Sequence, residues 1–272
     1  MSNMFFKNEN KGVTLLKSGL LEAEQSLRHC FTTRLGGVST GGCASLNTGF
    51  NRGEDREIVL RNYNLICEAA GFNFSRLSRT NQNHGIIVTE ITKENVGCGF
   101  FEPSLAYTDA IVTNMTDTPI VCHTADCVPI LLFDRAKQAC AAIHAGWRGM
   151  VDGVIEATVK KLEELYSSDP SDMVAAIGPC ICDCCFEVDE DVVETFRSAF
   201  GEGVIRNRTD GKKATVDLVK CAIEALSGCG ISERNIDSAH ECTKCNEELY
   251  YSHRRQGAER GTLAAIIQIT GR

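Results

Sequence analysis

Short runs of branched apolar residues, separated by residues that favour turns, occupy the middle and the end of this chain. Most runs are flanked by Gly, Pro or Asp, and this arrangement is typical of buried β-strands. The pattern predicts strands at residues 86–91, 119–122, 129–133, 138–143, 172–177 and 263–269.

Elsewhere the apolar residues recur with a helical period. In residues 55–70, Val59, Tyr63 and Ile66 fall on one stripe, and Gly71 is a typical stop signal for a helix. The same period predicts helices at residues 150–166, 189–200 and 216–226. Hairpin-like strands mixed with helices favour an α+β fold, with mixed sheets flanked by helices, over a doubly wound parallel sheet.

Composition narrows the class of protein. The 272 residues contain no linker-like or low-complexity stretch, so we expect a single catalytic domain spanning residues 1–272. A net charge of −8 argues against nucleic acid as the main partner. The polar start lacks the features of a secretion signal, and no apolar run reaches the ~18 residues of a membrane span. The 15 cysteines therefore indicate reduced thiols in the cytoplasm.

Three residues that bind metals well lie in turn-forming contexts beside predicted strands. They are His84 in QNHG, Cys127 in ADCVP and His144 in HAGWRG. A catalytic zinc site typically has three nitrogen, sulfur or oxygen ligands from the protein and one open position. Each residue also has an ordinary alternative, as a hydrogen-bonded histidine or a small buried cysteine.

The segment after the predicted strand 138–143 also suits an anion. Backbone N–H groups at a helix start, together with Arg148, are a typical phosphate site, although a plain strand-to-helix connection is the alternative. Arg61 lies off the apolar stripe of its helix and is a second candidate, or a residue of a solvated helix face. Asp126 is a candidate to orient a histidine ligand or to act as a general acid or base, with an Asx turn as the alternative.

A second group of cysteines lies in the C-terminal half. Residues 180–185 contain four cysteines, and Cys242 and Cys245 form a CxxC pair. This grouping is compatible with a structural zinc site, but no second CxxC pair follows at zinc-finger spacing. We expect these residues to be reduced thiols.

Taken in order, these motifs resemble the YfiH-like family, whose members have been labelled multicopper polyphenol oxidase or laccase-domain proteins. The resemblance covers nearly the whole chain. Its motifs here are GGVS at 36–39, SLN at 45–47, QNHG at 82–85, TDA at 108–110, TADCVP at 124–129, HAGWRG at 144–149, GP at 178–179, FEV at 186–188, CT at 242–243 and YSHRR at 251–255.

The resemblance implies an α+β domain related to bacterial toxin deamidases, with zinc, or alternatively copper, held by His84, Cys127 and His144. It implies phosphorolysis of adenosine, inosine and methylthioadenosine, with phosphate as co-substrate, and deamination of adenosine. The catalytic candidates are then Cys127, His84, His144 and Asp126. The candidates for binding phosphate or nucleoside are Arg148, Arg61 and Asn47. The partners expected are small molecules, in a monomer or small homo-oligomer.

Other functions stay open at this level. A true laccase needs roughly ten histidines for its copper centres, and this chain has six, although His84, His144 and Cys127 do offer the His₂Cys set of a blue-copper site. A metal-free cysteine hydrolase would use Cys127 as nucleophile and His144 as base. A binding module without catalytic activity is the third class. The metal content of the purified protein distinguishes the zinc enzyme from the copper oxidase and from the metal-free hydrolase.

Overall fold

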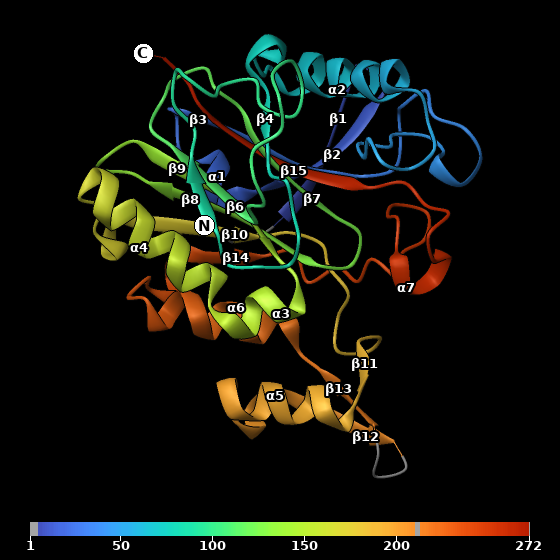
Figure 1. Cartoon of the computed structure of the whole chain (residues 1–272), viewed down its shortest axis with the longest axis vertical. Helices are drawn as coiled ribbons and strands as arrows, with labels where there is room; N and C mark the ends of the chain where they lie inside the picture. The colour runs from blue at the N-terminus through green and yellow to red at the C-terminus, as the bar shows by residue number, and fades with distance from the viewer. Residues whose placement is uncertain (1–4, 210–212, 272) are drawn as a thin grey trace.

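Two six-stranded sheets stand at the centre of the molecule (Figure 1). The computed structural model describes residues 5–209 and 213–271. Sheet 1 contains, in spatial order, β1 (Phe5–Asn10), β2 (Val13–Ser18), β3 (Leu27–Thr32), β15 (Leu263–Ile269), β7 (Ile120–Thr124) and β4 (Ser78–Arg79). Sheet 2 contains β14 (Ile236–Ser238), β10 (Met173–Ile177), β8 (Val128–Asp134), β9 (Ala139–Ala145), β6 (Ala110–Thr113) and β5 (Val88–Glu90).

Both sheets are mixed. The pairs β4–β7, β5–β6 and β10–β14 are parallel, and the remaining neighbours in the two sheets are antiparallel. Strands β8, β9 and β15 are buried at every position, as expected of strands covered on both faces. The predicted α+β fold with mixed sheets is confirmed.

The helices complete a layered arrangement. The helices are α1 (Gly19–Glu22), α2 (Arg56–Ala70), α3 (Trp147–Asp152), α4 (Val154–Tyr166), α5 (Glu190–Phe200), α6 (Leu218–Gly228) and α7 (His253–Gln256). One apolar cluster fills the space between the two sheets, a second joins sheet 1 to α2, and a third joins sheet 2 to α3, α4 and α6. Sheets 1 and 2 therefore form the two inner layers, and helices cover both outer faces (Figure 1).

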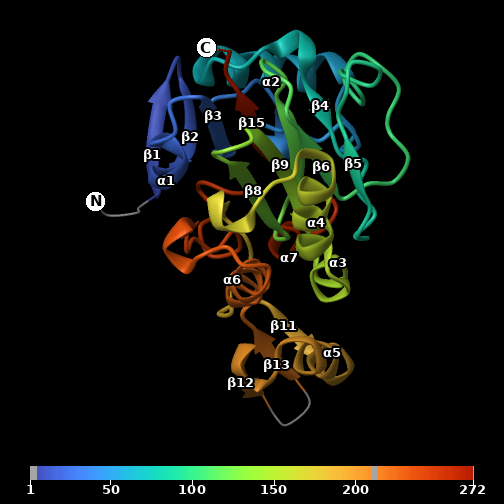
Figure 2. The same ribbon diagram turned by 90° about the vertical axis from the view of Figure 1, so that its left-hand side faces the viewer.

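A small lobe extends from this body (Figures 1 and 2). It consists of α5 and the antiparallel sheet 3, in the order β11 (Glu187–Asp189), β13 (Lys213–Val216) and β12 (Ile205–Thr209). Phe196 of α5 packs with Phe186 and Trp147, and this contact ties the lobe to the start of α3. No helix among the residues described is long and apolar enough to cross a membrane.

The predicted elements agree closely with those observed, with one correction. Residues 150–166 are not one helix but α3 and α4, separated at Gly153, whose φ of 93° ends α3 in the left-handed conformation. Strands β1, β2, β3, β4, β6 and β14 and the whole of sheet 3 are additional to the prediction. The extent of the catalytic domain, residues 1–272, stays a prediction, and residues 1–4, 210–212 and 272 lie outside the described residues.

Candidate metal centre

His84, Cys127 and His144 lie together, although three different segments supply them. His84 is in the loop between β4 and β5, Cys127 is in the turn where the chain passes from β7 in sheet 1 to β8 in sheet 2, and His144 is in β9. Their candidate ligand atoms all lie within 4.8 Å of one another. Cys127 Sγ is 3.7 Å from His84 Nε2, and the two imidazole rings are 4.8 Å apart between centroids. These separations suit three ligands of one metal ion.

Asp109, immediately before β6, holds both histidines in position. Its carboxylate accepts a hydrogen bond of 2.7 Å from His144 Nδ1, which leaves Nε2 of that ring free to bind a metal. The same carboxylate accepts the backbone N–H groups of Asn83, His84 and Gly85 at 3.1, 2.9 and 2.8 Å. One buried carboxylate thus fixes the loop of the first ligand and the ring of the third.

The backbone at the centre is constrained at three positions. His84 and Asp126 adopt left-handed conformations, with φ values of 65° and 97°, which are uncommon outside glycine. Gly146 has to be glycine because a Cβ atom there would lie 2.3 Å from Cδ2 of His84. The HAGWRG motif therefore lets the His84 ring lie directly against the backbone that follows His144.

The charges of these side chains reinforce one another. Burial disfavours the thiolate of Cys127, but the charge of His144 and hydrogen bonds from His144 and His84 outweigh it and lower the pKa of the thiol. Burial also disfavours the charged form of His144, but the Cys127 thiolate and Asp109 raise the pKa of the imidazole above its usual range. The site therefore stabilises a thiolate, the form of cysteine that binds metals.

The donor set fits zinc. Two imidazoles and one thiolate are among the ligands that zinc prefers, and Asp109 supplies the carboxylate–histidine contact that commonly supports a zinc ligand. His84 is exposed and Cys127 is half-buried, so the side of the centre that faces the cavity is open. An open side is the arrangement of a catalytic rather than a structural zinc site.

A cavity of about 770 Å³ lies against His84 and Cys127. Its volume is in the range of typical small-molecule sites. The lining combines polar side chains with an apolar surface that includes Trp147, Phe186 and Ile181. Because the aromatic residues come from α3 and from the segment before β11, the cavity lies where the small lobe meets the main body.

The lining of this cavity is strongly cationic. It includes Arg52, Arg148, Arg254 and Arg260, whereas Asp126 is its one carboxylate among the described residues. The Asp126 carboxylate is already engaged by Thr243 Oγ1 and by the backbone N–H of Arg254, both at 2.6 Å. The cavity therefore has an excess of positive charge, although the whole chain has a net charge of −8.

Arg260 is the most informative of these arginines. It is only 8% exposed, and its Nε has no hydrogen-bond partner among the described residues. Burial and the neighbouring Arg52 lower the pKa of its guanidinium to about 10, so Arg260 is still charged at neutral pH. A buried, incompletely paired guanidinium is costly unless an anion joins it, and this favours Arg260 as an anion-binding residue.

Three further residues predicted for the site, Arg148, Arg61 and Asn47, lie in different surroundings. Arg148 lines the cavity, and its guanidinium lies over the Trp147 ring, 4.2 Å from the centroid. Arg61 is exposed on α2 and is not among the residues that line the cavity. Asn47 is buried and supports a loop, because its side chain bonds Glu54 and the backbone of Gly49 and Thr262.

Asp126 lines the cavity but does not contact either histidine through the hydrogen bonds of the described side chains. The role predicted for Asp126 in orienting a histidine stays a prediction, and Asp109 is the carboxylate that bonds His144 Nδ1. Asp109, Arg52 and Arg260 are the site residues that the sequence-based reasoning missed. The TDA motif at residues 108–110 was the available signal for Asp109.

Comparisons with known proteins agree with this architecture. Residues 28–270 match the family model described as multi-copper polyphenol oxidoreductase laccase. A protein of Deinococcus radiodurans named purine nucleoside phosphorylase is 34% identical over 263 residues, which are 96% of this chain and 95% of that protein. Purine nucleoside phosphorylase YlmD of Geobacillus stearothermophilus is 33% identical over 246 residues, covering 89% of this chain and 88% of the relative.

A longer relative and a solved structure complete the comparison. Mouse purine nucleoside phosphorylase LACC1 is 32% identical over 264 residues, and the aligned region spans only 58% of its length. The crystal structure of YlmD from Geobacillus stearothermophilus superposes with a TM-score of 0.91 at 30% identity, over 99% of this chain and 100% of that one. The resemblance found in the motifs is confirmed, and the chain belongs to the YfiH-like family, whose family model has the laccase description.

Proposed function

We propose that this chain is a zinc-dependent purine nucleoside phosphorylase acting on adenosine, inosine and methylthioadenosine, with adenosine deaminase activity. The observation that supports it most is one cavity that combines an open His–Cys–His centre with the incompletely paired guanidinium of Arg260. A metal site with nothing to bind an anion would not distinguish a phosphorylase from a hydrolase. The names of the relatives point to the same class.

The metal would be held by His84, Cys127 and His144. When bound, zinc supplies Lewis-acid activation of water or of a substrate oxygen, which is the chemistry that purine deamination at C6 requires. Asp109 keeps a proton on Nδ1 of His144 through its hydrogen bond of 2.7 Å, and so keeps Nε2 available as a ligand. We expect the candidate general acid–base residue Asp126 mainly to hold its loop, because Thr243 and Arg254 occupy its carboxylate.

Phosphorolysis needs an anion site next to a surface for the purine. A phosphate oxygen forms a bond to C1′ as the bond from C1′ to the purine nitrogen breaks, and the purine leaves with the electron pair and takes up a proton. Arg260 and Arg52 offer charge for the phosphate, with Arg148 as a further candidate. Trp147 and Phe186 offer aromatic surface for the base.

A metal-free cysteine hydrolase is the second candidate, because Asp109, His144 and Cys127 form a continuous carboxylate–imidazole–thiol series. Phenol oxidation by several coppers is less well supported. Among the described residues, His84, Cys127 and His144 are the one group of three or more potential ligands that contains histidine. Neither His29 nor His123 belongs to a group of three or more candidate ligands among the described residues.

The decisive experiment measures purine release with and without phosphate, inosine formation without phosphate, and bound zinc. We expect wild-type protein to release adenine or hypoxanthine only when phosphate is present and to convert adenosine to inosine without it. Cys127→Ala and His84→Ala each remove a metal ligand and should abolish both activities together with the zinc. Cys229→Ala, a half-buried cysteine outside both cysteine-containing clusters, is the matched control.

Two outcomes would overturn the proposal. Zinc-loaded protein that is inert toward purine nucleosides and oxidises a phenol would restore the oxidase function. Metal-free protein that retains full hydrolytic activity, lost in Cys127→Ala, would instead establish the cysteine hydrolase. Loss of phosphorolysis with retained deamination in Cys127→Ala would show that one metal centre does not serve both reactions.

A further inference from the structure

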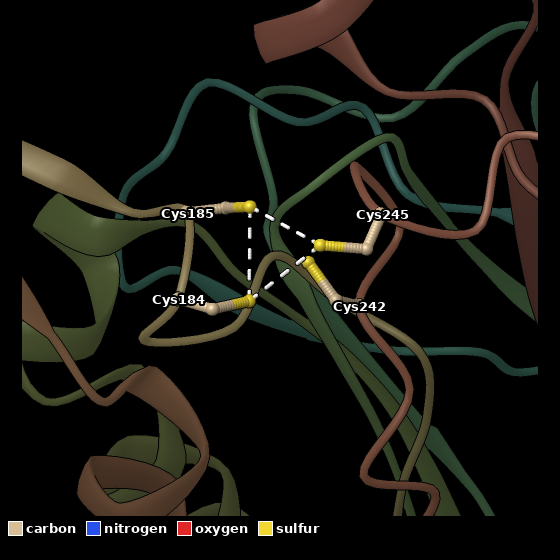
Figure 3. A group of neighbouring side chains, drawn as sticks. All are labelled: Cys184, Cys185, Cys242 and Cys245. Carbon is tan, nitrogen blue, oxygen red and sulfur yellow. Dashed lines mark hydrogen bonds between the residues drawn. The ribbon is translucent and has the colours of Figure 1, made fainter.

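Four cysteines outside the candidate active site converge on one point (Figure 3). Cys184 and Cys185 belong to the segment that leads into β11, whereas Cys242 and Cys245 belong to the loop after β14. The two pairs are about 60 residues apart in sequence, yet all four sulfur atoms lie within 4.8 Å of one another. The sequence grouped these cysteines but did not show which of them meet, and reduced thiols were the expectation because no second CxxC pair follows at zinc-finger spacing.

The sulfur-to-sulfur distances match those of a tetrahedral metal site. Cys184 Sγ is 3.7 Å from the sulfurs of both Cys185 and Cys245, and Cys185 Sγ is 3.4 Å from Cys245 Sγ. Four sulfurs at a zinc–sulfur distance of about 2.3 Å in a tetrahedron are separated by about 3.8 Å. We infer that Cys184, Cys185, Cys242 and Cys245 form a structural tetrathiolate site for a single zinc ion, separate from the His84–Cys127–His144 centre.

Alternative fates of these thiols fit the geometry less well. A disulfide requires sulfurs about 2.05 Å apart, and all three of the sulfur pairs above are much wider. An iron–sulfur cluster needs room for several iron and sulfide ions between the cysteines. Sulfurs that are nearly in mutual contact leave room for one ion only.

The surroundings provide support and access for the ion. The backbone N–H of Cys182 lies 3.4 Å from Cys242 Sγ, a contact of the kind that stabilises a metal-bound thiolate. Cys184, Cys242 and Cys245 also line a second cavity of about 470 Å³. Because Cys184 and Cys245 are exposed, a metal ion can reach the site from solvent. Binding requires the four thiols to release their protons, and no oxidation takes place.

The site would join two walls of the substrate cavity. The first cysteine segment continues directly to Phe186, and the second leads to Arg254 of α7; both of these residues line the 770 Å³ cavity. The segments already touch at the bridge between Cys180 and Cys242, and the Arg254 guanidinium donates to the backbone oxygen of Glu187 at 2.8 Å. A metal ion between the cysteine pairs would fix this wall where the aromatic surface and the arginine meet.

The test is a metal count on the full chain purified without added chelator. Wild-type protein should contain one zinc more than the double variant Cys184→Ser/Cys245→Ser, and that variant should lose thermal stability. Cys229→Ser, which changes a half-buried cysteine outside both clusters, should keep the wild-type count. His84→Ala/Cys127→Ala removes the first centre and should still retain one zinc, so this result does not depend on the proposed activity.

A second measurement applies if the cysteine variants fail to fold. Cobalt replacing zinc in the His84→Ala/Cys127→Ala protein should give the intense visible absorption of tetrahedral thiolate coordination, and zinc should displace it. An equal zinc content in wild type and in folded Cys184→Ser/Cys245→Ser would overturn the inference. So would a disulfide between the two segments in protein purified under anaerobic conditions, or cobalt binding without thiolate absorption.

Discussion

A single carboxylate connects the two histidines of the candidate metal centre. Asp109 bonds the ring of His144 and three consecutive N–H groups around His84, so its charge supports two ligands at once. Replacing it by Asn removes the charge and offers an amide that can hold the wrong tautomer of His144. We expect Asp109→Asn to weaken zinc binding by about 10- to 100-fold, measured by competition with a chelating dye.

Asp126→Asn is the matched control for that measurement. It changes a carboxylate of the same cavity that contacts Thr243 and Arg254 rather than a histidine. Zinc affinity close to wild type is therefore expected for this variant. If Asp126→Asn lost zinc while Asp109→Asn retained it, the assignment of the supporting carboxylate to Asp109 would be wrong.

The absence of a side chain on Gly146 allows the His84 ring to occupy its position. A Cβ atom on Gly146 would lie 2.3 Å from the His84 ring, well inside van der Waals contact. Gly146→Ala should therefore displace His84 and lower zinc content to less than about a tenth of wild type, measured by mass spectrometry of metals. Circular dichroism should show an intact fold. Gly228→Ala, where a new Cβ meets nothing within 4 Å, should keep its zinc.

At the residue scale, the candidate ligands are easier to find in the sequence than the residue that supports them. His84, Cys127 and His144 stand out because their side chains are chemically distinctive and each lies beside a turn. Asp109 did not stand out because its role depends on strand pairing: β6 lies beside β9, and this pairing places Asp109 next to His144. A carboxylate of this kind can be recognised only once the partner strand is known.

At the scale of elements, two distant segments build the candidate anion site. The loop that contains Arg52 is fixed to the segment before β15, because Thr262 bonds both Arg52 Nε and Asn47 Oδ1. Arg260 lies in that second segment, so both guanidinium groups reach the same cavity. The sequence does not show that these two loops lie side by side. The sequence-based prediction therefore named Arg148, at a helix start, and Arg61 instead.

This arrangement gives a kinetic prediction. Arg260→Met keeps the length of the side chain but removes its charge and its hydrogen-bond donors. We expect the KM for phosphate to rise by about tenfold or more, with a much smaller change in the KM for nucleoside, in initial-rate measurements. Arg61→Ala should leave both constants unchanged, because Arg61 is exposed on α2 outside the cavity lining. The opposite pattern would return the phosphate site to Arg61.

The periodic pattern predicted most long elements, and its failures have identifiable causes. Residues 263–269 form a strand with the predicted bounds because every position is apolar or becomes buried between two neighbours. One predicted helix is divided because Gly153 adopts a left-handed conformation within an otherwise continuous apolar stripe. The short strands of sheet 3 were missed because none of them contains a run of branched apolar residues.

At the scale of the whole molecule, charge is distributed unevenly. A chain with a net charge of −8 concentrates four arginines around one cavity, whose single described carboxylate is already bonded. An excess of positive charge within one cavity is the arrangement expected of a site for a small anion. The same cavity lies between the main body and the small lobe. Loss of the contacts among Cys184, Cys185, Cys242 and Cys245 is therefore expected to affect substrate binding more than it affects the two large sheets.

Acid stability is a further property of the whole molecule, and His29 provides a test. Its ring is fully buried on β3, where Nε2 accepts the backbone N–H of Ser18 at 2.9 Å and Glu22 Oε2 is 3.8 Å from Nδ1. Burial, assisted by the charge of Lys17, lowers the pKa of His29 from 6.5 to about 3 in the folded protein. Protonation therefore favours the unfolded chain, and His29 contributes stability that is full above pH 6.5 and is lost as the pH falls toward 3.

Between pH 7 and pH 5 this single group should cost the folded state about 2 kcal/mol. His29→Gln can still accept the Ser18 N–H but does not titrate, so the drop in unfolding free energy over this interval should be smaller by about that amount. Urea unfolding at both pH values measures the difference. His240→Gln, at an exposed position, should show the wild-type drop. An equal drop in wild type and His29→Gln would mean that the buried ring is not the source of the acid sensitivity.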